Sequence, residues 1–142
     1  MMSPNVWLKP MDVALIKETL KAKAANLSVL CVEDEDATRQ AIIQMLKRYF
    51  GTVMEAHNGE VGFCLYKEHS FDVIISDLAM PVMNGLVMSH AIKMRNPEQK
   101  MIILSAYHEE DDIRVLNNMG ISHILLKPFD TITLMESLLA IV

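Results

Sequence analysis

Five residues with side chains suited to metal and phosphate chemistry closely follow the ends of apolar runs in the sequence. They are Glu33 and Asp34 after 27–32, Asp77 after 71–75, Ser105 after 100–104 and Lys127 after 122–126. Carboxylates bind Mg²⁺ together with water and phosphate oxygens, and an aspartate can accept a phosphoryl group covalently. A lysine and a hydroxyl can neutralise the oxygens of a phosphoryl group in transfer. If the fold brings these residues together, they indicate Mg²⁺-dependent phosphoryl chemistry on an aspartate.

The apolar runs are the elements that must position these residues. Short, near-continuous runs with β-branched residues are typical of strands buried on both faces of a parallel sheet. The segments between them show helical spacing of apolar residues. The expected strands are 27–32, 52–56, 71–75, 100–104 and 122–126, and the expected helices are 37–50, 60–69, 86–95, 109–120 and 131–142. This alternation predicts an α/β fold with a doubly wound five-stranded parallel sheet and helices on both faces.

Right-handed crossovers place the C-terminal ends of all parallel strands at one edge of the sheet. The expected strand order is 2-1-3-4-5, with the switch point between the first and third strands. Asp34 and Asp77 would then flank the crevice at that point. Three carboxylates in one crevice repel one another unless a cation is present. The sequence therefore predicts an Mg²⁺ site at this edge, formed by Glu33, Asp34 and Asp77.

Composition limits the classes of protein to which the chain can belong. Its 142 residues are enough for one domain, and 51% hydrophobic with 22% charged residues is typical of a well-packed globular chain. The net charge of −5 disfavours nonspecific binding to nucleic acid or anionic membranes. No apolar run approaches the roughly 20 residues of a membrane span, and the N-terminus lacks a signal-peptide pattern. We expect a cytoplasmic protein with neither nucleic acid nor membrane as a direct partner.

The two cysteines, Cys31 and Cys64, show no metal-binding or disulfide spacing. Cys31 lies in a strand-like run and Cys64 in a helix-like one. Both are therefore predicted to be buried free thiols, as is usual in a reducing cytoplasm.

Residues 1–26 differ from the remainder of the chain and are predicted to be an N-terminal extension. Pro4 and Pro10 interrupt the first ten residues, and Asp12 could cap a helix that runs to about Ala25. The helix has a narrow apolar stripe, so it could pack on the domain or on a second chain. A linker is the equally weighted alternative. The expected boundaries are 1–26 for the extension and 27–142 for the main domain.

Four motifs carry a family resemblance, and they occur in the order VEDED (32–36), SDLAMPVMNG (76–85), ILSA (103–106) and LLKPF (125–129). They hold an acidic pair, an acceptor loop with Asp77, a strand end with Ser105 and a lysine-proline peptide at Lys127. Over about residues 27–142 the chain resembles the receiver domain of two-component response regulators. The resemblance implies a flavodoxin-like fold.

The resemblance also implies a role for each residue. Asp77 would accept a phosphoryl group from a histidine kinase or a phosphotransfer protein. Asp34, Asp77 and the backbone carbonyl of Ala79 would hold Mg²⁺, and Glu33 would contact the ion directly or through water. Ser105 and Lys127 would bind the phosphoryl oxygens. The chain would be a signalling domain that assists its own phosphorylation rather than an enzyme, and its partner could also be an output domain or a second copy.

The chain departs from the family pattern at four positions. Glu33 replaces the commoner aspartate, and Ala79 and Tyr107 occupy the positions that tune phosphoryl lifetime. Ile124 stands where the family usually has a Tyr or Phe that moves when the hydroxyl residue moves. The usual aromatic switch is therefore not expected, and the signal could pass through the 105–108 loop or through helix shifts.

Two other classes of protein fit part of the pattern. A phosphohydrolase with an aspartyl-phosphate intermediate needs a second acid two residues after its nucleophile, where this chain has Ala79. A receiver-like interaction module that works without phosphorylation is the main alternative, and Ile124 is the residue that favours it.

Overall fold

The computed structural model describes residues 12–106 and 110–142. Five strands form one sheet in the order β2-β1-β3-β4-β5, and every neighbouring pair is parallel. The strands are β1 (Ser28–Val32), β2 (Thr52–Ala56), β3 (Val73–Asp77), β4 (Lys100–Ser105) and β5 (His123–Leu126). The helices are α2 (Val13–Ala24), α3 (Asp36–Lys47), α4 (Gly59–Glu68), α5 (Gly85–Arg95), α6 (Glu110–Asn118) and α7 (Thr131–Ile141). The predicted fold class and strand order are confirmed.

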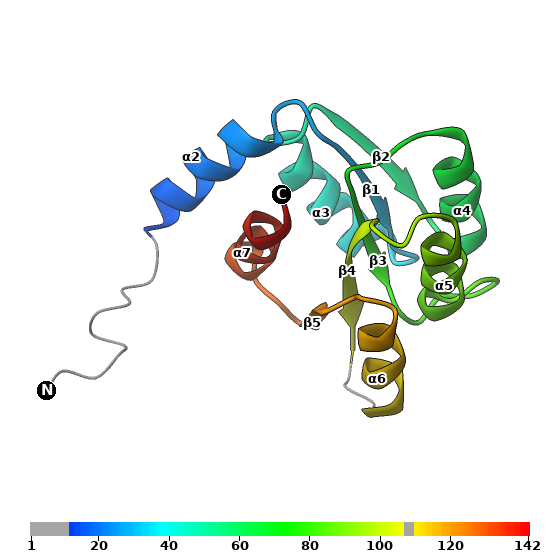
Figure 1. Cartoon of the computed structure of the whole chain (residues 1–142). Coiled ribbons are helices and arrows are strands. Elements are labelled where there is room, and N and C mark those ends of the chain that lie inside the picture. Colours follow the sequence, from blue (N-terminus) through cyan, green and yellow to red (C-terminus); the bar gives the residue numbers. More distant parts are fainter. Residues whose placement is uncertain (1–11, 107–109) are drawn as a thin grey trace, which may run out of the picture.

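Helices cover both faces of the sheet, with α3 and α7 on one side and α4, α5 and α6 on the other (Figure 1). Successive residues of the central strands point to opposite faces. Val29 and Cys31 of β1 belong to the hydrophobic cluster under α3 and α7, while Leu30 and Val32 belong to the cluster under α4, α5 and α6. This two-sided burial explains why the strands are apolar runs without polar alternation.

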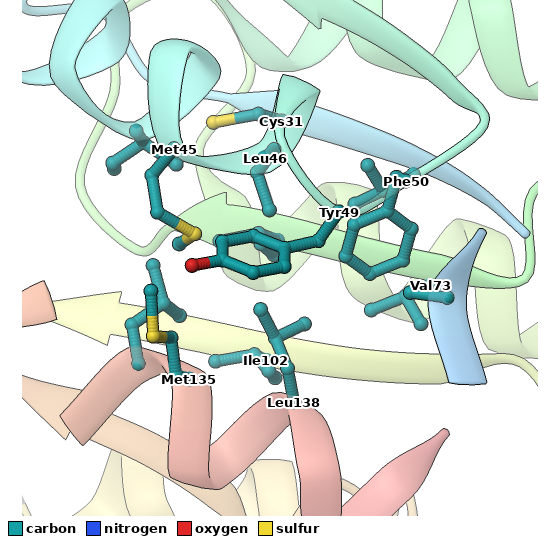
Figure 2. Packing of buried hydrophobic residues seen from close by; sticks show 14 of the residues in the cluster. Cys31, Met45, Leu46, Tyr49, Phe50, Val73, Ile102, Met135 and Leu138 are labelled. Atoms are coloured by element: carbon teal, nitrogen blue, oxygen red, sulfur yellow. The ribbon is translucent and has the colours of Figure 1, made fainter. Parts of the chain in front are cut away.

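The cluster on the α3 and α7 side is packed by large flexible side chains. Figure 2 shows Met45 and Tyr49 on one side of the cluster and Met135 and Leu138 on the other, with Ile102 of β4 beside Leu138. Methionine fills irregular gaps between helices because its side chain is unbranched and flexible. Several of the chain's twelve methionines therefore pack in the core.

Helix α2 packs beside α7 and closes one side of this same cluster. Asp12 caps the helix, since its side-chain oxygen accepts a hydrogen bond from the Ala14 N–H at 3.1 Å. Ile16, Leu20 and Ala24 recur every four residues and are buried in the cluster. Of the placements left open by the sequence, the structure has the one in which this helix packs on the domain.

Some local expectations were wrong. Helix α3 ends at Lys47 and not at Phe50, because the N–H groups of Arg48 and Tyr49 donate to carbonyls only three residues back, those of Met45 and Leu46, and so tighten the last turn. The helical spacing of the apolar residues 41, 42, 45, 46 and 49 predicts that Ala41 faces the core, but Ala41 is exposed. Cys64 is also exposed, whereas Cys31 is buried as expected. Cys64 lies on α4, which has ten residues and is apolar on more than one side, so one apolar side of this helix faces water.

The loop between β3 and α5 turns back so closely that only glycine fits at position 85. The Gly85 N–H donates to the Leu78 carbonyl at 2.7 Å, and a Cβ there would lie 2.0 Å from the Asp77 carbonyl oxygen. We expect Gly85→Ala to lower the free energy of unfolding by about 1–3 kcal/mol. Urea unfolding measures this, with exposed Val87→Ala as the control in the same helix. Equal losses in both variants would contradict the close-approach explanation.

Candidate functional site

The C-terminal edge of the sheet collects the side chains that the sequence singled out. Glu33 follows β1, Asp77 and Ser105 are the last residues of β3 and β4, and Lys127 follows β5. Strand β2, the outer strand next to β1, contributes none of them. The strand order therefore places these residues around the switch point between β1 and β3.

Three carboxylates meet at this edge. Glu33, Asp34 and Asp77 each offer an oxygen, and these oxygens lie within 4.8 Å of one another. Asp34 is exposed, Asp77 is nearly buried and Glu33 is fully buried. The crevice is thus open on the side of Asp34 and closed behind Glu33.

Lys127 is the cation that faces these carboxylates. Its Nζ lies 2.6 Å from Oε1 of Glu33 and 3.2 Å from Oδ2 of Asp77. The Lys127 N–H also donates to the Ser105 carbonyl at 2.7 Å, which fixes the end of β5 beside the end of β4. The following Lys127–Pro128 peptide bond is cis. Strand pairing and ion pairing together place the amine over the crevice.

The buried carboxylate of Glu33 provides a test of whether a cation fits. Oε2 of Glu33 is buried and has no hydrogen-bond partner among the described residues. A buried, unpaired carboxylate oxygen is costly, and a hard cation with oxygen ligands removes that cost. The donor set of three carboxylates beside an open cavity fits Mg²⁺. Ala79 lines this cavity next to Asp77, and its carbonyl as a ligand stays a proposal.

The cavity in front of the carboxylates has a volume of about 430 Å³. Asp77, Ser105 and Lys127 line it together with Asn84 and Asp112. A carboxylate, a hydroxyl-bearing residue and an amine therefore face one space large enough for a phosphoryl group. A second cavity of about 540 Å³ lies between α3 and α7 and reaches Lys127 from the other side; it is lined mainly by apolar residues, including Ala41, Met45, Phe129 and Leu134.

The site shifts the titration of its two central groups. Burial, with the neighbouring Asp77 carboxylate, raises the pKa of Glu33 to about 7, although Lys127 acts to lower it. Burial would lower the pKa of Lys127, but the hydrogen bond that its amine donates to Glu33 and the charges of Asp77 and Glu33 outweigh burial, so its pKa is raised. Lys127 is therefore charged at neutral pH, while Glu33 titrates near neutrality.

The raised pKa of Glu33 predicts a pH-dependent stability without Mg²⁺. A carboxyl group with a folded pKa of about 7 and an ordinary value of 4.5 favours folding when protonated, so its contribution is complete below pH 4.5 and is lost as the pH rises through 7. We expect Glu33→Gln to be more stable than the wild type at pH 8 by about 2 kcal/mol, and equally stable at pH 4.5.

Urea unfolding in EDTA at the two pH values measures this difference. Glu18→Gln, at an exposed glutamate of α2, serves as the control and should follow the wild type at both pH values. A Glu33→Gln variant that also parallels the wild type would contradict the raised pKa.

The structure also places the departures from the family pattern. Ile124 of β5 is half-buried and packs against the cluster on the α4, α5 and α6 side. An isoleucine held there cannot swing as an aromatic ring could. Tyr107, His108 and Glu109, and with them half of the 105–108 loop, lie outside the described residues.

Sequence reasoning missed Arg39, a buried arginine of α3 directly behind the acidic loop 33–36. Its only sequence signal is an acidic residue, Asp36, three positions earlier on the same helix. The prediction considered only residues that follow strands, and Arg39 lies within a helix.

No helix in the part of the chain that the structure describes is long and apolar enough to cross a membrane.

Comparison with known proteins defines the class. Residues 29–139 match the family model of the response regulator receiver domain. The chain is 31% identical over 111 residues to the chemotaxis protein CheY of Bacillus subtilis, covering 78% of this chain and 92% of that protein. The structure superposes on CheY4 of Vibrio cholerae with a TM-score of 0.77 and 28% identity, covering 82% of this chain and 99% of that one. The chain belongs to the response regulator receiver domain family.

Other relatives are much longer than this chain. The sensor kinase CckA of Brucella abortus is 34% identical over 119 residues, which are 80% of this chain but only 13% of that protein. The chain spans between 11% and 27% of the length of the first curated relatives it matches. The likeness to these longer proteins therefore concerns only the part of each that matches this chain.

Proposed function

We propose that Asp77 accepts a phosphoryl group and that this modification switches a protein-interaction surface. The observation that carries the proposal is the position of Asp77 in the crevice. Its Oδ2 lies 3.2 Å from the Lys127 amine, and its carboxylate lies within 4.8 Å of those of Glu33 and Asp34. A nucleophile and a charge-neutralising amine therefore line one cavity, and the carboxylates of Glu33 and Asp34 lie close to the nucleophile.

The donor class is a phosphohistidine of a sensor kinase or phosphotransfer protein. In the transfer, a carboxylate oxygen of Asp77 forms a bond to phosphorus while the bond from phosphorus to the histidine nitrogen breaks, and that nitrogen keeps the electron pair. Lys127 holds charge on the transferred oxygens, and Ser105 offers its hydroxyl to them. Bound Mg²⁺, held by Glu33, Asp34, Asp77 and the carbonyl of Ala79, would supply further charge neutralisation.

The switch follows from the charge that the modification adds. An aspartyl phosphate brings about two negative charges to a site that already holds three carboxylates. Lys127 gains a stronger partner than Glu33, so the ends of β4 and β5 are drawn toward Asp77. We propose that α6, β5 and α7 present the responding surface to an output domain or to a second copy. The apolar cavity between α3 and α7 supports docking of the donor next to Lys127.

In this proposal the chain is a signalling domain and not an enzyme with a separate substrate, and it acts in the cytoplasm. The alternative is an interaction module that takes no phosphate, and the half-buried Ile124 is the observation that favours it. Ile124 concerns only how a signal would pass to the interaction surface. The carboxylates and the lysine of the crevice concern whether Asp77 can accept a phosphoryl group.

Intact mass after incubation with acetyl phosphate tests the proposal. With Mg²⁺ we expect a gain of about 80 Da, one phosphoryl group, and with EDTA no gain. A protein that binds Mg²⁺ but gains no mass would overturn the proposal in favour of the interaction module. Amide chemical shifts on addition of a phosphoryl analogue test the switch, and unchanged shifts in α6, β5 and α7 would exclude that surface.

A further inference from the structure

We propose that Arg39 is a positioning residue that holds the acidic loop 33–36 from behind and so places Glu33 and Asp34 for Mg²⁺ binding. The inference rests on the proposed function, because it concerns the same cation site. Arg39 does not line the cavity, and its hydrogen bonds go to the Glu33 carbonyl, Asp36 and Glu55 and not to the carboxylates of Glu33, Asp34 and Asp77. It would act through the backbone and not on the phosphoryl group.

The guanidinium of Arg39 joins three elements at once. Nη1 donates to the Glu33 carbonyl at 2.8 Å, Nη2 to Oδ1 of Asp36 at 2.6 Å and Nε to Oε1 of Glu55 at 3.2 Å. These partners lie at the end of β1, at the start of α3 and on β2. Arg39 is only 8% exposed, and its bond to the Glu33 carbonyl is buried, whereas its carboxylate partners Asp36 and Glu55 are exposed to solvent. The three charge-assisted bonds together fix its orientation.

The backbone of Glu33 is consequently fixed at both of its polar groups. Its N–H donates to the Ala56 carbonyl at 3.0 Å, and its carbonyl accepts from Arg39. The peptide group between Glu33 and Asp34 cannot rotate without breaking the second of these bonds. Because that peptide sets the directions of both side chains, the bond to Arg39 determines where two of the three carboxylates lie.

Charge and positioning predict opposite effects of removing this arginine. A cation near a divalent ion repels it, so a purely electrostatic role means that Mg²⁺ binds more tightly once Arg39 is neutralised. A positioning role means weaker binding, because the ligand oxygens lose their geometry. Lysine keeps the charge but cannot form the three-way fork of a guanidinium. Arg39→Lys and Arg39→Met therefore separate the two roles.

The experiment is an Mg²⁺ titration of the full chain, followed by amide chemical shifts at constant ionic strength. We expect the dissociation constant to rise about tenfold in both Arg39→Lys and Arg39→Met, as is usual for residues that orient metal ligands. The matched control is Arg48→Met, at an exposed arginine just after α3, and it should bind like the wild type. Urea unfolding of each variant in EDTA records any loss of stability separately.

Three results would overturn the role of Arg39. Tighter binding in Arg39→Met with unchanged binding in Arg39→Lys would show a charge effect only. Unchanged binding in both, with lower stability, would show that the arginine is merely structural. If the wild type itself binds no Mg²⁺, the proposed cation site fails first, and the role of Arg39 fails with it. Should Arg39→Met not fold, Arg39→Lys decides between positioning and structure.

Discussion

Replacing Asp77 with asparagine is expected to abolish the phosphoryl mass gain completely. The amide has nearly the shape of the carboxylate, but its nitrogen and oxygen are too weakly nucleophilic to attack phosphorus. Glu33 and Asp34 remain, so Lys127 keeps a carboxylate partner at 2.6 Å and the fold is retained. Intact mass after incubation with acetyl phosphate and Mg²⁺ measures the loss, and the far-ultraviolet circular dichroism spectrum verifies the fold.

Two further aspartate variants separate loss of the acceptor from loss of the cation site and from damage to the fold. Asp34→Asn removes a carboxylate near the proposed ion but leaves the acceptor, so we expect the same final mass gain at a rate lower by roughly a hundredfold. Asp111→Asn, at an exposed position of α6, should behave as the wild type. A mass gain that persists in Asp77→Asn would place the acceptor elsewhere. A gain lost equally in all three variants would point to damage of the fold and not to the loss of the acceptor.

The sequence predicts most of this site because strand ends are easy to locate in a parallel α/β chain. Apolar runs end abruptly, and the residues that follow must meet at one edge once the crossovers are right-handed. Asp77, Ser105 and Lys127 were found in this way, and they lie around one cavity. The lack of such a residue at the end of β2 agrees with the predicted strand order, in which β2 lies beside β1 on the side away from β3.

Details that depend on the length and direction of side chains could not be predicted. The glutamate at position 33 is long enough to bring Oε1 within 2.6 Å of Lys127 while Oε2 stays buried and unpaired. Spacing along the sequence does not contain such distances. Arg39 was missed for a related reason. In the sequence, a buried arginine of a helix that binds a loop cannot be distinguished from an exposed arginine on the helix surface. The exposure of Cys64 likewise depends on which side of α4 meets α5.

The sequence also could not predict whether α2 packs on its own domain or on a partner. Three apolar residues spaced by four fit the surface of the domain and the surface of a partner equally well. The structure places Ile16, Leu20 and Ala24 in the same cluster as Met135 and Leu138 of α7. Because these residues share a core with α7, the proposed boundary at residue 27 separates two parts of the sequence that pack as one unit.

Leu20→Ala is therefore expected to lower the free energy of unfolding of the whole chain by about 2–5 kcal/mol. Leu20 is fully buried between α2 and the cluster, and its truncation leaves a cavity that neighbouring side chains fill only in part. Urea unfolding followed by circular dichroism measures the loss. Lys21→Ala, at the exposed neighbouring position on the same helix, is the control and should change stability by less than about 0.5 kcal/mol.

The alternative placements of α2 predict a different outcome. If the helix were a linker, or if it packed on a second chain, the isolated chain would bury nothing at position 20, and Leu20→Ala would match Lys21→Ala. A large loss confined to Leu20→Ala means that α2 contributes to the core beside α7. Since α7 follows directly from the loop that holds Lys127, loosening α2 would then also affect the element next to the crevice. In that case the Mg²⁺ dissociation constant of Leu20→Ala should rise, while that of Lys21→Ala should not.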